Sequence, residues 1–202
     1  MNKRNYQKEL DSLIEKTEGS GRRPKLLLHV CCAPCSSYVQ EYLGRFFDIT
    51  LFFYNPNMDT EQEYKLRSSE LERLVREAGF PSGIVICKYD PECFEEIAEG
   101  LENEPEGGKR CWKCYELRMR KAAEYASENG FDYFTTTLSI SPHKDADWIN
   151  LIGEELAEEY GVSHLPSDFK KRNGYKRSVE LSKEYGLYRQ EYCGCKGSRQ
   201  GR

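Results

Sequence analysis

Short apolar runs alternate along the chain with segments in which apolar residues recur every three or four positions. The runs at 25–30, 48–53, 84–87 and 131–135 have the length and composition of buried strands. The segments at 38–43, 71–78, 111–126 and 149–156 have the periodicity of helices packed on one face. This alternation predicts an α/β fold, with an open, mostly parallel sheet joined by right-handed crossovers and flanked by helices.

Local signals mark where several of these helices begin and end. Thr60 and Glu63 form a capping box, Gly79 ends the helix that follows, and Asn129-Gly130 stops a later one. The first 20 residues predict an amphipathic N-terminal helix, and 162–195 a helical, basic C-terminal extension followed by a flexible tail over 196–202. A chain of 202 residues is expected to form a single catalytic domain over 1–202.

Composition narrows the functional classes. Charged residues make up 32% and the net charge is -4, which excludes a wholly basic nucleic-acid coat protein but leaves room for a local basic patch. The charged N-terminus has no apolar core of a signal peptide, and no run approaches the ~18 apolar residues of a membrane helix. We therefore expect a cytoplasmic protein without a membrane partner.

Nine cysteines are too few for a disulfide scaffold and odd in number. Cys31, Cys32 and Cys35 follow the first predicted strand at the start of a helix, and Cys111 and Cys114 form a second CxxC pair. Loops that follow parallel strands meet at the carboxyl edge of the sheet, so we expect 31–35, 54–59, Cys87 and 136–144 to converge there.

Three interpretations of the clustered thiols remain open at this point. They could be small core residues, which suits Cys87 and Cys93 better than the clustered five. They could form a zinc site or an iron–sulfur cluster, and spacing alone does not separate these two. A helix N-terminus would lower thiolate pKa values and favour a negatively charged cofactor.

Cys193-Gly-Cys195 favours redox chemistry. Two cysteines separated by one residue can close only a small, strained and easily reduced ring, which suits an electron relay; metal ligands or idle thiols are the alternatives. A candidate acid is His143, in the loop after the fourth predicted strand, which could protonate a leaving oxygen or be an exposed loop residue. We interpret His29, within an apolar strand, as a core residue.

A basic segment over 170–177, interrupted by Tyr175, resembles a stripe that contacts phosphates, although a solvated loop explains it almost as well. Neither glycine-rich nucleotide motif is present, so ATP use is not supported.

Several motifs in order together resemble the cobalamin-independent epoxyqueuosine reductases of the QueH type, over about residues 25–195. The matching segments are His29-Val-Cys-Cys-Ala-Pro-Cys35, Tyr54-Asn-Pro-Asn57, Cys111-Trp-Lys-Cys114, Phe131-Asp-Tyr-Phe-Thr-Thr-Thr-Leu138, Ser141-Pro-His-Lys144 and Tyr188-Arg-Gln-Glu-Tyr-Cys-Gly-Cys195. The resemblance implies a nucleotide-hydrolase-like (HUP-like) fold and reduction of epoxyqueuosine to queuosine at the anticodon wobble base of tRNA.

The resemblance also implies cofactors and roles. It assigns a 4Fe-4S cluster to Cys31, Cys32, Cys111 and Cys114, and a redox-active disulfide to Cys193 with Cys195. It also implies an additional mononuclear iron, for which Cys35 is the candidate contact. As a hypothesis, this iron acts as a Lewis acid on the epoxide oxygen and His143 is the acid.

The expected partners are the anticodon loop of tRNA and an unidentified electron donor. Candidate tRNA contacts are Asn55, Asn57, Arg110, Lys113, Lys144, Lys170, Lys171 and Arg172. Two other functions compete with this one. The first is a zinc-stabilised tRNA-binding module, against which the extra thiols count. The second is an ATP-dependent tRNA thiolation enzyme, whose glycine-rich loop is missing.

Overall fold

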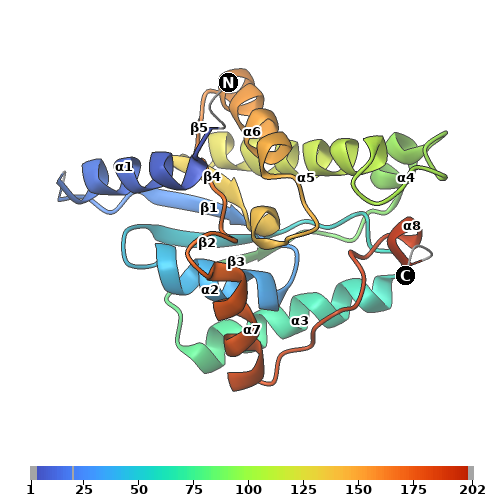
Figure 1. Cartoon of the computed structure of the whole chain (residues 1–202), viewed down its shortest axis with the longest axis horizontal. Coiled ribbons are helices and arrows are strands. Elements are labelled where there is room, and N and C mark those ends of the chain that lie inside the picture. Colours follow the sequence, from blue (N-terminus) through green and yellow to red (C-terminus); the bar gives the residue numbers. More distant parts are fainter. Residues whose placement is uncertain (1–3, 20, 200–202) are drawn as a thin grey trace.

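A five-stranded parallel sheet forms the centre of the computed structural model, which describes residues 4–19 and 21–199 (Figure 1). The strand order β3-β2-β1-β4-β5 is that of doubly wound folds, and the switch point lies between β1 and β4. The predicted α/β parallel sheet is thereby confirmed. The strands are β1 (Lys25–His29), β2 (Asp48–Phe53), β3 (Gly83–Ile86), β4 (Tyr133–Thr136) and β5 (Ser163–His164).

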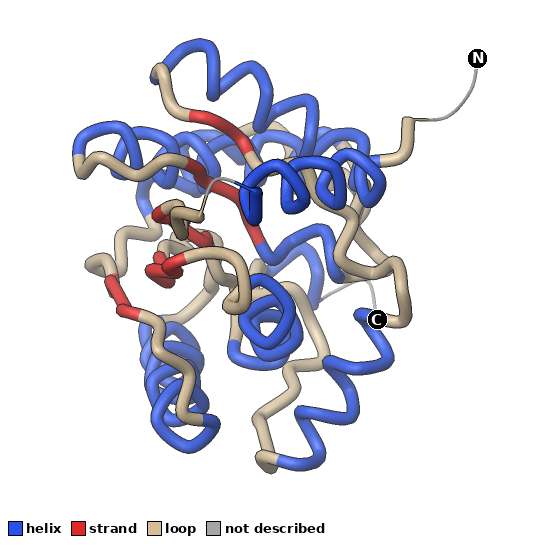
Figure 2. The backbone as a smooth tube through the Cα atoms, turned by 90° about the vertical axis from the view of Figure 1, so that its left-hand side faces the viewer, coloured by secondary structure: helices blue, strands red, loops and turns tan. Residues whose placement is uncertain are grey.

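Helices cover both faces of the sheet (Figures 1 and 2). In Figure 1, α5 and α6 lie above it, and α2, α3 and α7 lie below. The helices are α1 (Tyr6–Gly19), α2 (Ala33–Leu43), α3 (Glu61–Ala78), α4 (Glu92–Ala98), α5 (Lys109–Glu128), α6 (Ala146–Tyr160), α7 (Gly174–Glu184) and α8 (Lys196–Arg199), with a 3₁₀ turn η1 (Thr137–Ile140) after β4.

The alternation of side chains along β1 divides the core into two layers. Leu26 and Leu28 pack with residues of α1 and α2, whereas Leu27 packs with α5 and α6. All three side chains are fully buried, so each face of the sheet is covered. His29 continues the strand as a buried residue, with Nδ1 2.7 Å from Thr136 Oγ1, which confirms its predicted place in the core.

The predicted ends of α3 are confirmed. The Glu63 N–H donates to Thr60 Oγ1 at 3.1 Å, and Gly79 ends the helix with a φ of 65°, where a side chain would be strained. No helix among the described residues is long and apolar enough to cross a membrane.

The C-terminal segment differs from the sequence prediction in two ways. The last long helix begins at Gly174 rather than near Ser178, so part of the basic stripe is helical. The segment 196–199, expected to be flexible, forms α8, and its Gly197 lies directly against the Arg110 guanidinium, where a Cβ would come within 2.4 Å. The remainder of the predicted tail, 200–202, lies outside the described residues.

Candidate functional site

Three thiols meet where β1 passes into α2, at the carboxyl edge of the sheet. Cys32 is the residue before the first turn of α2, and Pro34 occupies that turn, where a missing N–H costs nothing. The sulfurs of Cys31, Cys32 and Cys35 all lie within 4.8 Å of one another. Thr137, which follows β4, accepts a hydrogen bond from the Cys31 N–H at 3.4 Å and so ties this loop to the switch point.

Among these three thiols, only that of Cys31 readily loses its proton. The Cys32 and Cys35 side chains stabilise a thiolate at Cys31 by hydrogen bonds, which hold the pKa of Cys31 well below its ordinary value. The same interaction with Cys31 raises the pKa of Cys32 to about 12. A bound metal would replace those protons, because it stabilises all of the thiolates at once.

The second pair of cysteines lies on the first turns of α5. Cys114 is buried, and desolvation raises the pKa of its thiol to about 12. Cys111 is half-buried, and its sulfur accepts a hydrogen bond from the Gly107 N–H at 3.3 Å. Negative charge on Cys193 acts to raise the pKa of both thiols, so the start of α5 contributes to the same region. They are not members of the compact group formed by Cys31, Cys32 and Cys35, which we call the thiol group.

A buried arginine, which the sequence analysis missed, connects these parts. Arg118 is 1% exposed, and its guanidinium lies 3.9 Å from Cys114 Sγ and donates to Asn55 Oδ1. Asn55 is itself fixed by its bond to the Val30 carbonyl at 3.0 Å. The i, i+4 spacing from Cys114 placed Arg118 on the inward face of α5, and that spacing was the available signal.

The Cys-Gly-Cys segment crosses the same edge of the sheet. Arg67, 1% exposed on α3, donates to the Cys193 carbonyl at 3.2 Å, and Lys144 Nζ lies 3.1 Å from Cys193 Sγ. Burial acts to raise the pKa of Cys193, but Lys144 and Arg118 bring it below its ordinary value. The structure holds Cys193 and Cys195 as free thiols, so the expected disulfide is not present in it.

A cavity of about 150 Å³ brings the predicted chemistry together. Its walls include the two cysteines Cys31 and Cys35, the loop residues His143 and Lys144, and Cys193. His143 is exposed, whereas the ammonium of Lys144 points to the Cys193 sulfur. The cavity is therefore surrounded by cysteine thiols, the ammonium of Lys144 and the imidazole of His143.

The predicted tRNA contacts separate into exposed and internal residues. Lys170 and Lys171 line a groove of about 640 Å³ that also includes His143 and Lys144, although Lys170 pairs with Asp168 at 2.6 Å. Lys113 is exposed on α5.

Three other predicted contacts bond to groups of the protein itself. Arg172 pairs with Asp11 on α1, and the amide of Asn55 is fully buried and bonded on both sides. Arg110 is 4% exposed and donates to the carbonyls of Leu101 and Glu102, which leaves little of its side chain accessible to a phosphate. The paired groups of these three side chains thus connect parts of the fold.

The donor set fits a thiolate-bound metal centre. Three sulfurs grouped at a helix start, with a buried cation close by, suit soft thiolate coordination, for which zinc and iron–sulfur clusters are the usual occupants. The group contains no carboxylate or imidazole, which argues against calcium, magnesium or manganese.

Comparisons with known proteins agree with one another. The family model described as epoxyqueuosine reductase QueH matches residues 26–201. A relative of that name from Streptococcus pyogenes serotype M1 is 45% identical over 195 residues, covering 95% of this chain and 76% of its own. Another from Staphylococcus epidermidis is 43% identical over 197 residues (95% and 83%), and one from Thermotoga maritima is 35% identical over 176 residues (84% and 88%).

Among solved structures, the chain has a distant likeness to a U34-tRNA thiolase, NcsA from Methanococcus maripaludis with its 4Fe-4S cluster. The identity is 13% and the TM-score 0.48, with 92% of this chain and 65% of that one covered.

Proposed function

The chain belongs to the epoxyqueuosine reductase QueH family, and we propose that it reduces epoxyqueuosine to queuosine at the wobble position of tRNA. The reaction removes the epoxide oxygen as water and leaves an alkene, which takes two electrons and two protons. The proposal concerns a cytoplasmic enzyme, since its substrate is tRNA.

One observation carries the proposal: a single cavity is lined by Cys31 and Cys35 of the thiol group, by Cys193 and by His143. These side chains come from three separate segments of the chain, and together they offer electron transfer, metal ligation and proton donation. A zinc-stabilised binding module would have no use for Cys193 beside that group.

The electrons are assigned to Cys193 and Cys195. Oxidation of the two thiols to a disulfide releases two electrons and two protons, which balances the reduction of one epoxide to one alkene and one water. Lys144, 3.1 Å from Cys193 Sγ, favours the reactive thiolate. His143 lines the cavity and is exposed, so it can deliver a proton to the departing oxygen and regain one from solvent.

The proposed cofactor is a 4Fe-4S cluster held by Cys31 and Cys32 of the thiol group together with Cys111 and Cys114 of α5. Cys35, within 4.8 Å of both Cys31 and Cys32, is the proposed contact of an additional iron. When bound, these centres would relay electrons and polarise the epoxide oxygen. Arg118 offsets part of the negative charge that the thiolates bring into the interior.

The groove beside the cavity is the proposed path of the tRNA backbone. It shares His143 and Lys144 with the cavity and extends to Lys170 and Lys171, so phosphates bound there would lie next to the reacting base. The cavity volume of about 150 Å³ suits the epoxide-bearing ring of a base that has left the anticodon stack, rather than the whole base.

The test is anaerobic purification, followed by iron and sulfide analysis and an assay on tRNA carrying epoxyqueuosine. We expect a coloured protein with iron and sulfide, and conversion to queuosine by the reduced enzyme. A colourless protein with stoichiometric zinc, or iron-loaded enzyme that leaves the epoxide intact, would contradict the proposal.

A further inference from the structure

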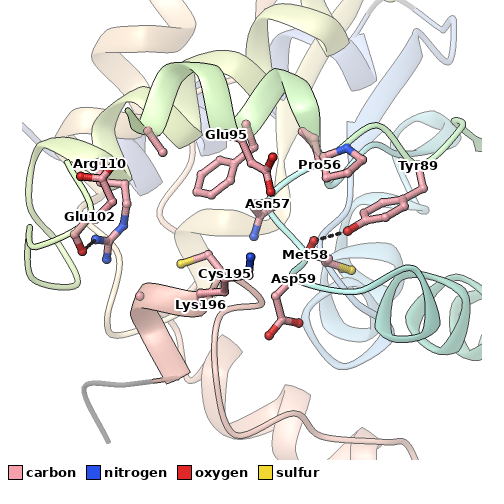
Figure 3. A pocket seen from close by; sticks show the side chains of 14 residues that line it. Pro56, Asn57, Met58, Asp59, Tyr89, Glu95, Glu102, Arg110, Cys195 and Lys196 are labelled. Carbon is pink, nitrogen blue, oxygen red and sulfur yellow. Dashed lines mark hydrogen bonds between the residues drawn. The ribbon is translucent and has the colours of Figure 1, made fainter. Parts of the chain in front are cut away.

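The Cys193-Gly194-Cys195 segment separates two cavities. Cys193 lines the cavity of about 150 Å³ that contains the thiol group, whereas Cys195 lines a different cavity of about 460 Å³. Figure 3 shows the second cavity, with the Cys195 sulfur at its floor, Tyr89 on one side and Arg110 on the other. Each sulfur of the pair therefore has its own access route, and the route to Cys195 does not pass the cluster ligands.

The second cavity has polar residues in its walls. Asn57 Oδ1 and Arg110 Nε are buried and have no hydrogen-bond partner among the described residues. Asn57 is 2% exposed and its Nδ2 faces Gly194, where a Cβ would come within 3.2 Å. Both side chains line the cavity, so its wall includes polar residues, although these two atoms themselves lie beneath the cavity surface.

The remaining walls and the size indicate a small molecule. Pro91, Phe94 and Ala98 give an apolar wall, opposite Met58. A volume of about 460 Å³ is in the range of small-ligand sites. Because Cys195 is only 7% exposed, this cavity is the approach to its sulfur for a compact reagent rather than for the active site of another protein.

We propose that this cavity binds a low-molecular-weight dithiol, which attacks Cys195 and regenerates the reduced Cys193–Cys195 pair. The inference rests on the proposed function, in which each turnover leaves these two residues as a disulfide. It identifies the chemical class of the electron donor and the sulfur that the donor meets.

The exchange has two balanced steps. A thiolate of the dithiol attacks Cys195 Sγ, forms a mixed disulfide with it, and breaks the bond to Cys193, which leaves as a thiolate. The second thiolate of the reagent attacks its own sulfur in the mixed disulfide and releases Cys195 as a thiolate, which takes up a proton. The reagent leaves as a cyclic disulfide, having supplied two electrons.

The charges around the two sulfurs set this direction. Lys144 Nζ lies 3.1 Å from Cys193 Sγ, whereas the Cys195 thiol contacts a neutral hydroxyl, Ser198 Oγ, at 3.6 Å. Thiol–disulfide exchange is faster when the leaving sulfur is stabilised as a thiolate, so attack at Cys195 with departure of Cys193 is favoured over the reverse.

The first test uses the holoenzyme after one turnover on epoxyqueuosine tRNA under anaerobic conditions. β-Mercaptoethanol, a monothiol that has no second sulfur to release Cys195 within the same molecule, is added in limiting amount for a short time. The reaction is stopped with acid, and free thiols are alkylated before peptide mass spectrometry. We expect the mixed disulfide on Cys195 and the alkyl group on Cys193. The opposite distribution would overturn the inference.

The second test narrows the cavity. With dithiothreitol as the probe, Ala98→Trp is expected to slow re-reduction of the oxidised pair about tenfold, because exchange depends on access to the sulfur. Glu96→Trp, on an exposed position of the same helix outside the cavity, should match the wild type. Equal rates in both variants would contradict a donor site here, and cluster absorption verifies that each variant is folded and loaded.

Single-turnover conversion by pre-reduced enzyme separates the two hypotheses. If pre-reduced enzyme fails to convert the epoxide, the proposed function is wrong. If it converts the epoxide normally but Cys193 carries the mixed disulfide, only the donor site is wrong.

Discussion

The guanidinium of Arg118 lies 3.9 Å from the sulfur of Cys114, one turn away on α5, and both side chains are buried. A buried cation without a carboxylate partner is costly unless other negative charge offsets it. Thiolates of a bound cluster would supply that charge, and Asn55 adds a neutral acceptor. Arg118 is thus a positioning residue, and we expect it to stabilise the site mainly when the thiolates of a bound cluster are present.

Arg118→Met should therefore weaken cluster retention. Loss of a charge-assisted interaction of about 1.5–3 kcal/mol corresponds to iron release that is roughly tenfold to a hundredfold faster. The measurement is iron release to a chelator from anaerobically prepared protein. Arg118→Lys keeps the charge and should be intermediate, and Arg120→Met, a partly exposed arginine of the same helix, is the matched control. Equal release from Arg118→Met and wild type would exclude this role.

The thiol group was predictable because its elements are local. An apolar run followed by Cys31-Cys-Ala-Pro-Cys35 predicts a strand end and a helix start, and parallel strands bring such loops to one edge. The compact grouping of Cys35 with Cys31 and Cys32 depends on side-chain directions that spacing does not fix.

Arg118 and Arg67 could not be predicted in the same way. An arginine in a charged helix is usually solvated, and only the packing of α3 and α5 against the sheet buries these two to 1% exposure. Strand β5 and helix α8 were missed because two and four residues carry no periodicity. Their positions depend on tertiary contacts, such as the one between Gly197 and Arg110.

Replacement of Cys111 or Cys114 by Ser should remove the visible colour and the activity together, because each is a proposed cluster ligand. Cys35→Ser should retain the cluster absorption and lose only the additional iron. Cys87→Ser is the control, since Cys87 lies outside the group of clustered thiols. Iron analysis and absorption spectra decide the assignments, and a Cys114→Ser protein with full colour would refute the proposed ligand set.

Lys144→Met should shift the ionisation of Cys193 to higher pH. Lys144 Nζ, 3.1 Å from Cys193 Sγ, favours the thiolate, so removal of this opposite charge raises the pKa of Cys193. The rate of Cys193 alkylation by iodoacetamide, followed by peptide mass spectrometry, should reach its midpoint at correspondingly higher pH. Lys144→Arg retains the charge and should resemble the wild type; an unchanged profile in Lys144→Met would show that the ammonium does not control this thiol.

Lys171 offers a test of the tRNA groove. Each phosphate contact made by a lysine contributes about 0.7–0.9 to the slope of log affinity against log salt concentration. Lys171→Ala should lower the slope for tRNA binding by up to about this amount. Lys183→Ala, an exposed lysine near the end of α7 and outside the groove, should leave it unchanged. Equal slopes for the two variants would place the tRNA elsewhere.

His164 should make the fold sensitive to mild acid. Its ring is buried against α6, where a Cβ on Gly153 would come within 2.4 Å, and neither ring nitrogen has a hydrogen-bond partner among the described residues. Burial lowers the pKa of His164 to about 3, so the folded state keeps the ring neutral while the unfolded chain protonates near pH 6.5. This contribution to stability is complete above about pH 6.5 and is lost as the pH falls toward 3, at about 1.4 kcal/mol per pH unit.

His164→Leu should remove that slope from the free energy of unfolding measured in urea between pH 7 and pH 5. Because both ring nitrogens are unpaired, the apolar replacement should leave stability at pH 7 nearly unchanged or raise it. His29, buried with its pKa also lowered to about 3, retains its own contribution, so the variant keeps part of the dependence. His143→Gln, at an exposed position, should keep all of this pH dependence. If His164→Leu keeps all of it as well, His164 takes up its proton in the folded protein as readily as in the unfolded chain, which contradicts the prediction.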